Sequence, residues 1–328
     1  MSKAAGQDKT ASRGVRHFCA AALACVSILP ALGHGADTLH SADIAKRDLK
    51  PGDFPRWQQL VPNVYSYEGL HSADSDGTIV NTVSLIVVTT DGVTVVDGQG
   101  DVTQTQLMID NIGKLTQQPI KYVVVASDHG DHVGGNAAFK AAYPNLVFIS
   151  SPVSQQHLAK NANPPTQTVA DKRTIRMGKT ELQLLNLGRA HTGGDLAVYL
   201  PQSKILFMSE IYLHDVFPAM RSAYPTEWVG AIEKAQALDV SWYVPGHGFV
   251  DDPATMKRDL EQARKALVYV IAEAKRLRAA GLACESAKNC PAATQANWGV
   301  YGDWALRNSQ GPVAIAKVYQ EIDGTLPM

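Results

Sequence analysis

Ser127-Asp128-His129-Gly130-Asp131-His132 places two imidazoles and two carboxylates directly after the apolar run Tyr122-Val123-Val124-Val125-Ala126. The run is short and rich in β-branched residues, which is typical of a buried strand, and Gly134-Gly135 then opens a helical segment. The polar cluster therefore lies in a strand-to-helix turn, where α/β sheets commonly place their ligand sites. We expect three of its residues to bind metal: His129, Asp131 and His132.

A second interpretation is a polar turn in which Asp131 caps the helix and the histidines are merely exposed, since Asp is common at helix starts. That interpretation leaves two later histidine turns unexplained. His191 lies in the glycine-rich stretch 187–195, and His247 lies between Gly246 and Gly248. Glycines beside a histidine let its backbone approach other loops closely, so both are further ligand candidates.

Glu210 ends another strand-like run, Leu206-Phe207-Met208-Ser209, and its carboxylate could bridge two ions or complete one site. Imidazole and carboxylate ligands without a thiolate suit zinc, and also iron or manganese. We take zinc as the expected ion. Zinc with an open coordination position lowers the pKa of its water to about 7 and supplies hydroxide at neutral pH, so the predicted chemistry is hydrolysis.

The order and spacing of these residues resemble the metallo-β-lactamase fold superfamily, across roughly residues 61–250. The resemblance implies an α/β fold, specifically a four-layer αβ/βα sandwich. It also implies that Asp131 orients the attacking hydroxide. Its implied metal ligands are His129 and His191 in a first site, Asp131, His132 and His247 in a second, and Glu210 in the position of a bridging aspartate.

Two positions depart from the family pattern. Ser127 stands where the family has its first histidine, and a serine hydroxyl is a poor zinc ligand. Glu210 is one methylene longer than the usual aspartate. We therefore expect one zinc site at Asp131, His132 and His247, with its neighbour weakened or empty. Asp128 is an alternative ligand for that neighbour, although adjacent residues on an extended segment point apart.

The predicted function is that of an exported zinc-dependent hydrolase, in which a zinc-bound hydroxide cleaves an ester, thioester or amide/lactam bond of a small molecule. β-Lactamase-like activity falls within this class. The alternative is a non-catalytic or weakly metal-binding protein that keeps the fold as a binding scaffold. Arg221 is either a ligand for a substrate carboxylate or, as we favour, a solvated or structural residue. The resemblance implies that the loop with His71 flanks the cleft, and His214, Phe217, Met220 and Tyr224 follow Glu210 in the sequence. His157 is expected at the surface.

The first 36 residues have the pattern of a signal peptide, with basic residues ahead of the apolar run Phe18–Leu32 and small residues around Gly33 to Ala36. The run contains Pro30 and is too short for an ordinary transmembrane helix, although a retained anchor is the alternative. We expect a periplasmic or secreted protein with no membrane association after leader cleavage. The net charge is −1, with Lys and Arg spread among acids, so a nucleic-acid partner is not expected.

The chain has 328 residues and is 45% hydrophobic, which is enough for a sizeable core. After the leader we expect an extended arm over 37–60, a catalytic domain over 61–282 and a C-terminal extension over 283–328 packed on that domain. Cys284 and Cys290 are plausible disulfide partners in an oxidising compartment. The oligomeric state is left open. The expected strands are 61–68, 79–89, 93–97, 122–126, 146–149, 173–177, 180–187, 195–200, 204–208 and 242–244, and the main expected helices are 103–116, 136–142, 225–238, 253–280 and 312–322.

Overall fold

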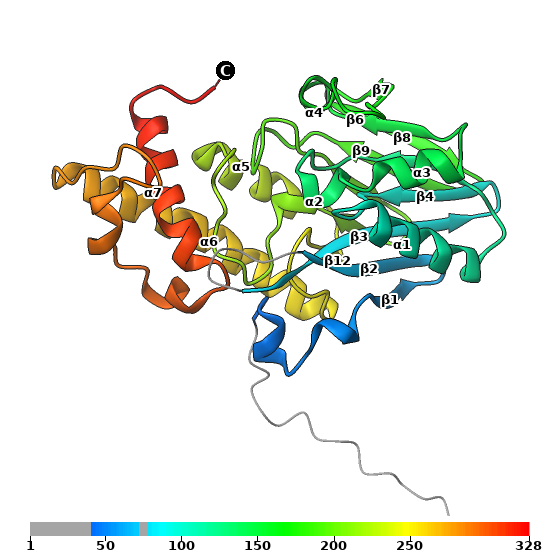
Figure 1. Ribbon diagram of the computed structural model, residues 1–328, viewed down its shortest axis with the longest axis horizontal. Coiled ribbons are helices and arrows are strands. Elements are labelled where there is room, and N and C mark those ends of the chain that lie inside the picture. The colour runs from blue at the N-terminus through cyan, green and yellow to red at the C-terminus, as the bar shows by residue number, and fades with distance from the viewer. Residues whose placement is uncertain (1–40, 72–77, 328) are drawn as a thin grey trace, which may run out of the picture. The chain divides into compact units, whose positions relative to one another are not determined.

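Two β-sheets pack face to face in the computed structural model, which describes residues 41–71 and 78–327 (Figure 1). The predicted signal peptide, 1–36, lies outside the described residues. The seven-stranded sheet runs in the order β1 to β7, antiparallel from β1 to β4 and parallel from β4 to β7. Its strands are β1 (Arg56–Val61), β2 (Val64–His71), β3 (Val80–Thr89), β4 (Gly92–Val96), β5 (Ile120–Val124), β6 (Val147–Ser150) and β7 (Gln167–Thr168).

The five-stranded sheet has the order β12-β11-β10-β9-β8, and only its β11–β12 pair is parallel. Its strands are β8 (Lys172–Met177), β9 (Thr180–Leu185), β10 (Ala197–Leu200), β11 (Ile205–Phe207) and β12 (Trp242–Val244). Side chains of a strand alternate between faces. Val124 accordingly packs between the sheets, whereas its neighbour Val123 packs against the helices outside.

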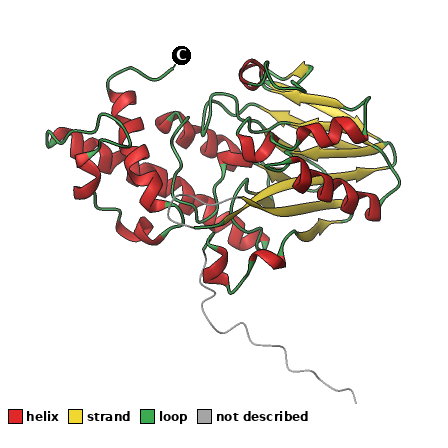
Figure 2. Ribbon diagram, viewed as in Figure 1, coloured by secondary structure: helices red, strands yellow, loops and turns green. Residues whose placement is uncertain are grey.

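Helices cover both outer faces, which completes the predicted four-layer αβ/βα sandwich (Figure 2). The seven-stranded sheet is covered by α1 (Val102–Leu115) and α3 (Asn136–Ala142). The five-stranded sheet is covered by α5 (Pro225–Gln236) and α6 (Pro253–Ala279), and α7 (Arg307–Ile322) joins the same hydrophobic cluster. Among the residues described, no helix combines the length and apolarity needed to cross a membrane. The shorter helices are α2 (Gly130–Val133), α4 (Pro152–His157), η1 (Ile44–Arg47), η2 (Pro51–Asp53), η3 (Ser209–Ile211), η4 (Pro291–Gln295) and η5 (Gly299–Asp303).

The boundaries of α6 follow from its sequence. The Asp252 carboxylate caps its start by accepting from the backbone N–H groups of Ala254 and Thr255, and Pro253 occupies the first helical position. Gly281, at φ +74°, follows the last turn in the left-handed conformation that glycine adopts readily. The predicted helix 253–280 is therefore confirmed almost to the residue.

The expectation of an extended arm over 37–60 is wrong for its last part, because Arg56–Val61 forms strand β1. β1 is an edge strand whose side chains are mostly exposed or half-buried, and Arg56, Gln58 and Gln59 interrupt the apolar alternation of a typical strand. The last helix also begins earlier than predicted, at Arg307, and contains Pro312 in its interior. Because proline is commoner at the first position of a helix, the sequence favoured a start at Pro312 rather than at Arg307.

The C-terminal extension packs on the rest of the fold. Cys284 and Cys290 form a disulfide at its beginning. The Tyr319 hydroxyl of α7 donates to the carbonyl oxygen of Leu282 at 3.0 Å, and Glu321 accepts from the backbone and hydroxyl of Thr226 at 2.9 and 2.7 Å. α7 is thereby joined to the ends of both α5 and α6.

This packing predicts that Ile315→Ala destabilises the whole protein. Ile315 is fully buried in α7, and an Ile→Ala change in a core costs about 2–5 kcal/mol of unfolding free energy. Ile322→Ala is the matched control, because Ile322 on the same helix is 44% exposed. Denaturant unfolding should show one transition, shifted only by Ile315→Ala. Equal effects of the two variants would contradict the packing described.

Candidate metal centre

The predicted ligands converge from four strand ends into two groups that share Glu210. His129 lies in the turn after β5, and Asp131 and His132 follow it on α2. The remaining side chains come from the β9–β10 loop, from η3 after β11 and from the turn after β12. The first group is Asp131, His132, Glu210 and His247, and the second is His129, His191 and Glu210.

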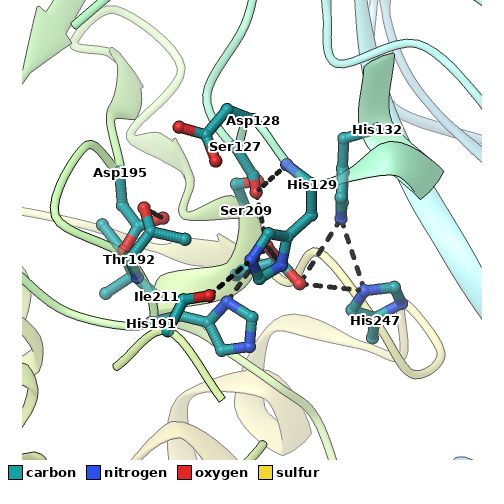
Figure 3. Close-up of polar contacts among 12 residues, drawn as sticks. Ser127, Asp128, His129, His132, His191, Thr192, Asp195, Ser209, Ile211 and His247 are labelled. Carbon is teal, nitrogen blue, oxygen red and sulfur yellow. Dashed lines mark hydrogen bonds and ion pairs between the residues drawn. The ribbon is translucent and has the colours of Figure 1, made fainter. Parts of the chain in front are cut away.

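In the first group, the imidazoles of His132 and His247 point toward one another (Figure 3), with their Nε2 atoms 3.3 Å apart. The Asp131 Oδ2 atom lies 3.4 Å from Nε2 of His132 and 3.0 Å from Nε2 of His247. Glu210 Oε1 completes the group, 3.9 and 3.5 Å from the same two nitrogens. Four ligand atoms from three separate segments thus surround one point.

The donor atoms of this group fit a metal ion. Nδ1 of His132 faces Asp97 Oδ2 at 3.1 Å, and Nδ1 of His247 faces the carbonyl oxygen of Asn81 at 2.8 Å. With an N–H at each Nδ1, the Nε2 of a neutral ring presents a lone pair. Two such lone pairs repel one another at close range unless a cation or proton lies between them. The group could therefore hold zinc, with Asp97 and Asn81 orienting its imidazoles.

In the second group, a single oxygen, Oε2 of Glu210, receives three contacts. Nδ1 of His129 lies 2.9 Å from it, Nδ1 of His191 lies 3.0 Å from it, and the Ser127 hydroxyl donates a short hydrogen bond to it. Ser127 and Glu210 are thus in direct contact. The two positions that were expected from the sequence to depart from the family pattern form one interaction.

Asp128 is turned away from both groups. Its Oδ2 atom lies 2.9 Å from Nδ1 of His157, whose side chain is 58% exposed, so His157 is at the surface as predicted. Asp128 as a substitute ligand is therefore wrong. The capping interpretation of Asp131 is also wrong, because His129 is the N-cap of α2 and Asp131 lies inside the helix.

Close backbone approach explains the glycines beside His247. A Cβ atom on Gly246 would lie 2.5 Å from the backbone carbon of Ser209, and one on Gly248 would lie 2.1 Å from the carbonyl oxygen of His214. Gly248 also has φ +86°. Side chains at these positions would push His247 away from Glu210, so the glycines are needed to bring the two ligands together.

Asp97 is a site residue that the sequence analysis missed. It is fully buried at the end of β4, where it accepts from the backbone N–H of Ala126 at 2.7 Å and from the Ser209 hydroxyl at 2.5 Å. It therefore holds the turns that carry both ligand groups and also faces His132. The available signal was an acidic residue directly after the apolar strand Val93–Val96.

Asp195 was also missed. It is buried and accepts from the backbone and hydroxyl of Thr192 at 2.6 and 2.7 Å, which fixes the loop that carries His191. Burial raises the pKa of Asp195 to about 7, against these hydrogen bonds. The sequence feature that could have identified Asp195 is its position three residues after the hydroxyl of Thr192 in the same glycine-rich turn.

A cavity of about 420 Å³ opens over the ligands. Its lining includes five polar side chains of the two ligand groups: His129, Asp131, His191, Glu210 and His247. Of the residues that follow Glu210, Arg221 lines the cavity, whereas His214, Phe217, Met220 and Tyr224 are buried outside its lining. The side chain of His71 lies outside the described part of the chain.

The sequence model for the Metallo-beta-lactamase superfamily matches residues 77–247, more than half of the chain. The chain belongs to the metallo-β-lactamase superfamily. It is 26% identical over 210 residues to the "Metallo-beta-lactamase type 2" of Bacillus sp. (strain 170), covering 62% of this chain and 80% of that protein. The protein of the same name from Elizabethkingia meningoseptica is 24% identical over 210 residues, covering 62% and 83%.

The fold is likewise that of solved metallo-β-lactamases. The structure of the metallo-β-lactamase from Pontibacter korlensis matches with a TM-score of 0.57 and 24% identity, covering 64% of this chain and 98% of that one. Membership of this superfamily and the metallo-β-lactamase relatives support a metal-dependent hydrolase, and the ligand groups described above could hold the metal. About a third of this chain has no counterpart in that structure.

Charges within the two groups are strongly linked. Burial opposes the charged form of His129, but the Glu210 carboxylate raises its pKa to about 9. Burial also opposes charge on His247, yet hydrogen bonds to Asp131 and Glu210 raise its pKa to about 10. The imidazoles in turn hold the pKa of the Glu210 carboxyl well below its usual range against the effect of burial. A bound cation and these protons would therefore compete for the same ligands.

We expect Asp97→Asn to weaken zinc binding. The asparagine amide would present N–H groups to Nδ1 of His132 and favour the tautomer whose Nε2 carries the hydrogen. Loss of such a supporting acceptor typically costs 10- to 100-fold in metal affinity. Asp128→Asn is the control, because Asp128 pairs with His157 outside both groups. Competition with a chromogenic chelator measures the affinity, and unchanged zinc binding by Asp97→Asn would contradict the role given to Asp97.

Protein stripped of metal should lose stability as the pH rises. The folded pKa values of His129 and His247 lie above the ordinary value of 6.5. Their contribution is therefore complete below about pH 6.5 and is lost as the pH rises through about 9 to 10. Melting temperatures measured in EDTA should fall over that range, and the fall should be smaller in His247→Gln. A flat profile in the unsubstituted protein would refute these shifts.

Proposed function

We propose that this protein is a zinc-dependent hydrolase that cleaves an ester, thioester or amide/lactam bond of a small-molecule substrate. The observation that carries the proposal is the convergence of Asp131, His132, Glu210 and His247 beside an open cavity. Membership of a superfamily of metal-dependent hydrolases supports it. The similarity to metallo-β-lactamases makes a lactam one candidate bond.

Zinc in this site would supply a Lewis acid for the scissile carbonyl and would lower the pKa of water to about 7. The protein's own groups would handle orientation and protons. Asp131 lines the cavity, so its carboxylate would orient the attacking water, accept a proton from it and pass that proton to the leaving group. His129 and His191, held by Glu210, would position the substrate beside it.

We further propose one firm zinc site rather than two. The Ser127 hydroxyl, His129 and His191 all meet Oε2 of Glu210, which leaves that oxygen engaged. Oε1 of the same carboxylate faces His132 and His247. The carboxylate thus contributes one oxygen to the zinc site and the other to a hydrogen-bonded group.

Arg221 is an arginine that lines the cavity, and it is exposed. It forms no ion pair with an acidic residue within 41–71 or 78–327. A substrate carboxylate is one partner of suitable charge. Solvation alone also satisfies an exposed guanidinium, and this remains the simpler role.

We infer that the mature protein works in the periplasm or outside the cell. The pattern of residues 1–36 is that of an export signal. The Cys284–Cys290 disulfide supports the inference, since disulfides persist mainly in oxidising compartments.

Elemental analysis combined with a panel of chromogenic lactam, ester and thioester substrates tests the function. We expect one zinc per chain and zinc-dependent hydrolysis of at least one substrate class. His247→Ala should lose both bound zinc and activity, the latter by more than about a hundredfold, since even supporting residues cost 10- to 100-fold. His157→Ala, which removes an exposed imidazole, is the control.

Retention of stoichiometric zinc by His247→Ala would refute the ligand assignment. Zinc binding without hydrolysis of any substrate would instead favour the non-catalytic scaffold.

The contact between Ser127 and Glu210 predicts how a second site can be restored. A histidine at position 127 would meet the Glu210 carboxylate, so Ser127→His alone should raise the zinc content little. The double variant Ser127→His/Glu210→Asp shortens the acid by one methylene and should raise the content toward two per chain. A ratio that stays at one in the double variant would show that something other than this pair limits the site.

A further inference from the structure

Part of the lining of the cavity comes from the C-terminal extension. Leu306, Ser309, Gln310 and Val313 line the same cavity as His129 and His247. Their spacing of three, four and seven residues places them on one face of α7 and its N-cap. One helix face therefore looks into the cavity.

The segment just before α7 is hydrogen-bonded to the loop that follows Glu210. The backbone N–H of Phe217 donates to the carbonyl oxygen of Ala305 at 2.9 Å, and Val216 and Ala305 form a β-bridge. Val216 itself lines the cavity, as do Leu213 and Ala219 of the same loop. The loop and the helix therefore form one continuous wall.

Trp298 strengthens this junction. Its ring packs edge-on against Phe217, with centroids 5.1 Å apart, and lies against Gly311 of α7. A Cβ atom on Gly311 would come within 2.9 Å of Cζ2 of Trp298, so the absence of a side chain at Gly311 leaves room for the indole. At the other end, Arg278 of α6 contacts both carboxylate oxygens of Asp323, at 2.8 and 3.0 Å. The helix is held along its length.

The wall and the metal ligands belong to different parts of the chain. All the ligands lie within residues 77–247, the region that the superfamily shares, whereas α7 lies beyond it. In Figure 1, α7 runs beside α6 and outside the two sheets. A cavity whose metal ligands lie in the region matched by the family model and whose wall lies partly outside it can differ from other members in the substrate it selects.

We propose that α7 is the specificity-determining wall of this site and selects an acyl substrate with an apolar chain, which packs against Leu306 and Val313 of the helix and Leu213 and Val216 of the adjoining loop. Each methylene buried there contributes to affinity through the hydrophobic effect. Ser309 and Gln310 supply polar groups at the same face. The inference rests on the proposed function in that it takes the metal-facing cavity as the place where substrate binds.

Calorimetric binding of two hydroxamates to the zinc-loaded full-length chain tests the wall without requiring turnover. Acetohydroxamate probes the metal alone, and octanohydroxamate adds an alkyl chain that reaches α7. We expect octanohydroxamate to bind at least about tenfold more tightly, the gain from burying roughly two methylenes. The larger side chain of Val313→Phe would occupy the part of the cavity beside α7. It should reduce this preference below about threefold, with acetohydroxamate binding little changed.

Val313→Thr is a nearly isosteric second variant that preserves packing while adding a hydroxyl, and it should also reduce the preference. Ile322→Phe, at an exposed position of the same helix, is the control and should keep it. An equal affinity for the two hydroxamates in the unsubstituted protein, or a preference that survives both Val313 variants, would overturn the inference. Failure of both ligands to bind would overturn it too. If the protein prefers octanohydroxamate as expected but hydrolyses no substrate, the proposed function is refuted, whereas the role of α7 in selectivity stands.

Discussion

The burial of the Glu210 carboxylate is the constraint on which the site depends. Glu210 is 3% exposed, and an ionised carboxylate taken out of water is costly unless each oxygen is compensated. Ser127, His129 and His191 compensate Oε2, whereas His132 and His247 face Oε1. Because these partners come from separate strand ends, the two sheets must be packed before the carboxylate is satisfied. The folding of the sandwich and the assembly of the site are therefore one process.

The same carboxylate links the two positions that were expected from the sequence to depart from the family pattern. The Ser127 hydroxyl donates a hydrogen bond to Oε2 of Glu210, so both positions belong to one contact. The neighbouring group of Asp131, His132 and His247 could still hold a metal ion, because Oε1 of Glu210 faces its two imidazoles.

Local patterns predicted much of this structure. The four strand ends that carry ligands follow apolar runs, and the helix 253–280 has a cap, a proline and a glycine at its ends. Both features could therefore be predicted from residues that are neighbours in the sequence. β1 was missed because an edge strand need not be apolar. Asp97 and the α7 wall were missed for a different reason. Their roles depend on contacts across the fold, such as Asp97 with Ser209, which no local pattern records.

The central claim is that Glu210 divides its two oxygens between one metal and one hydrogen-bonded group. Anomalous scattering from crystals grown with zinc tests it most directly, because it locates each ion against its ligands. A single zinc peak is expected among Asp131, His132, His247 and Glu210. A second peak of similar height between His129 and His191, or a single peak at that position, would contradict it.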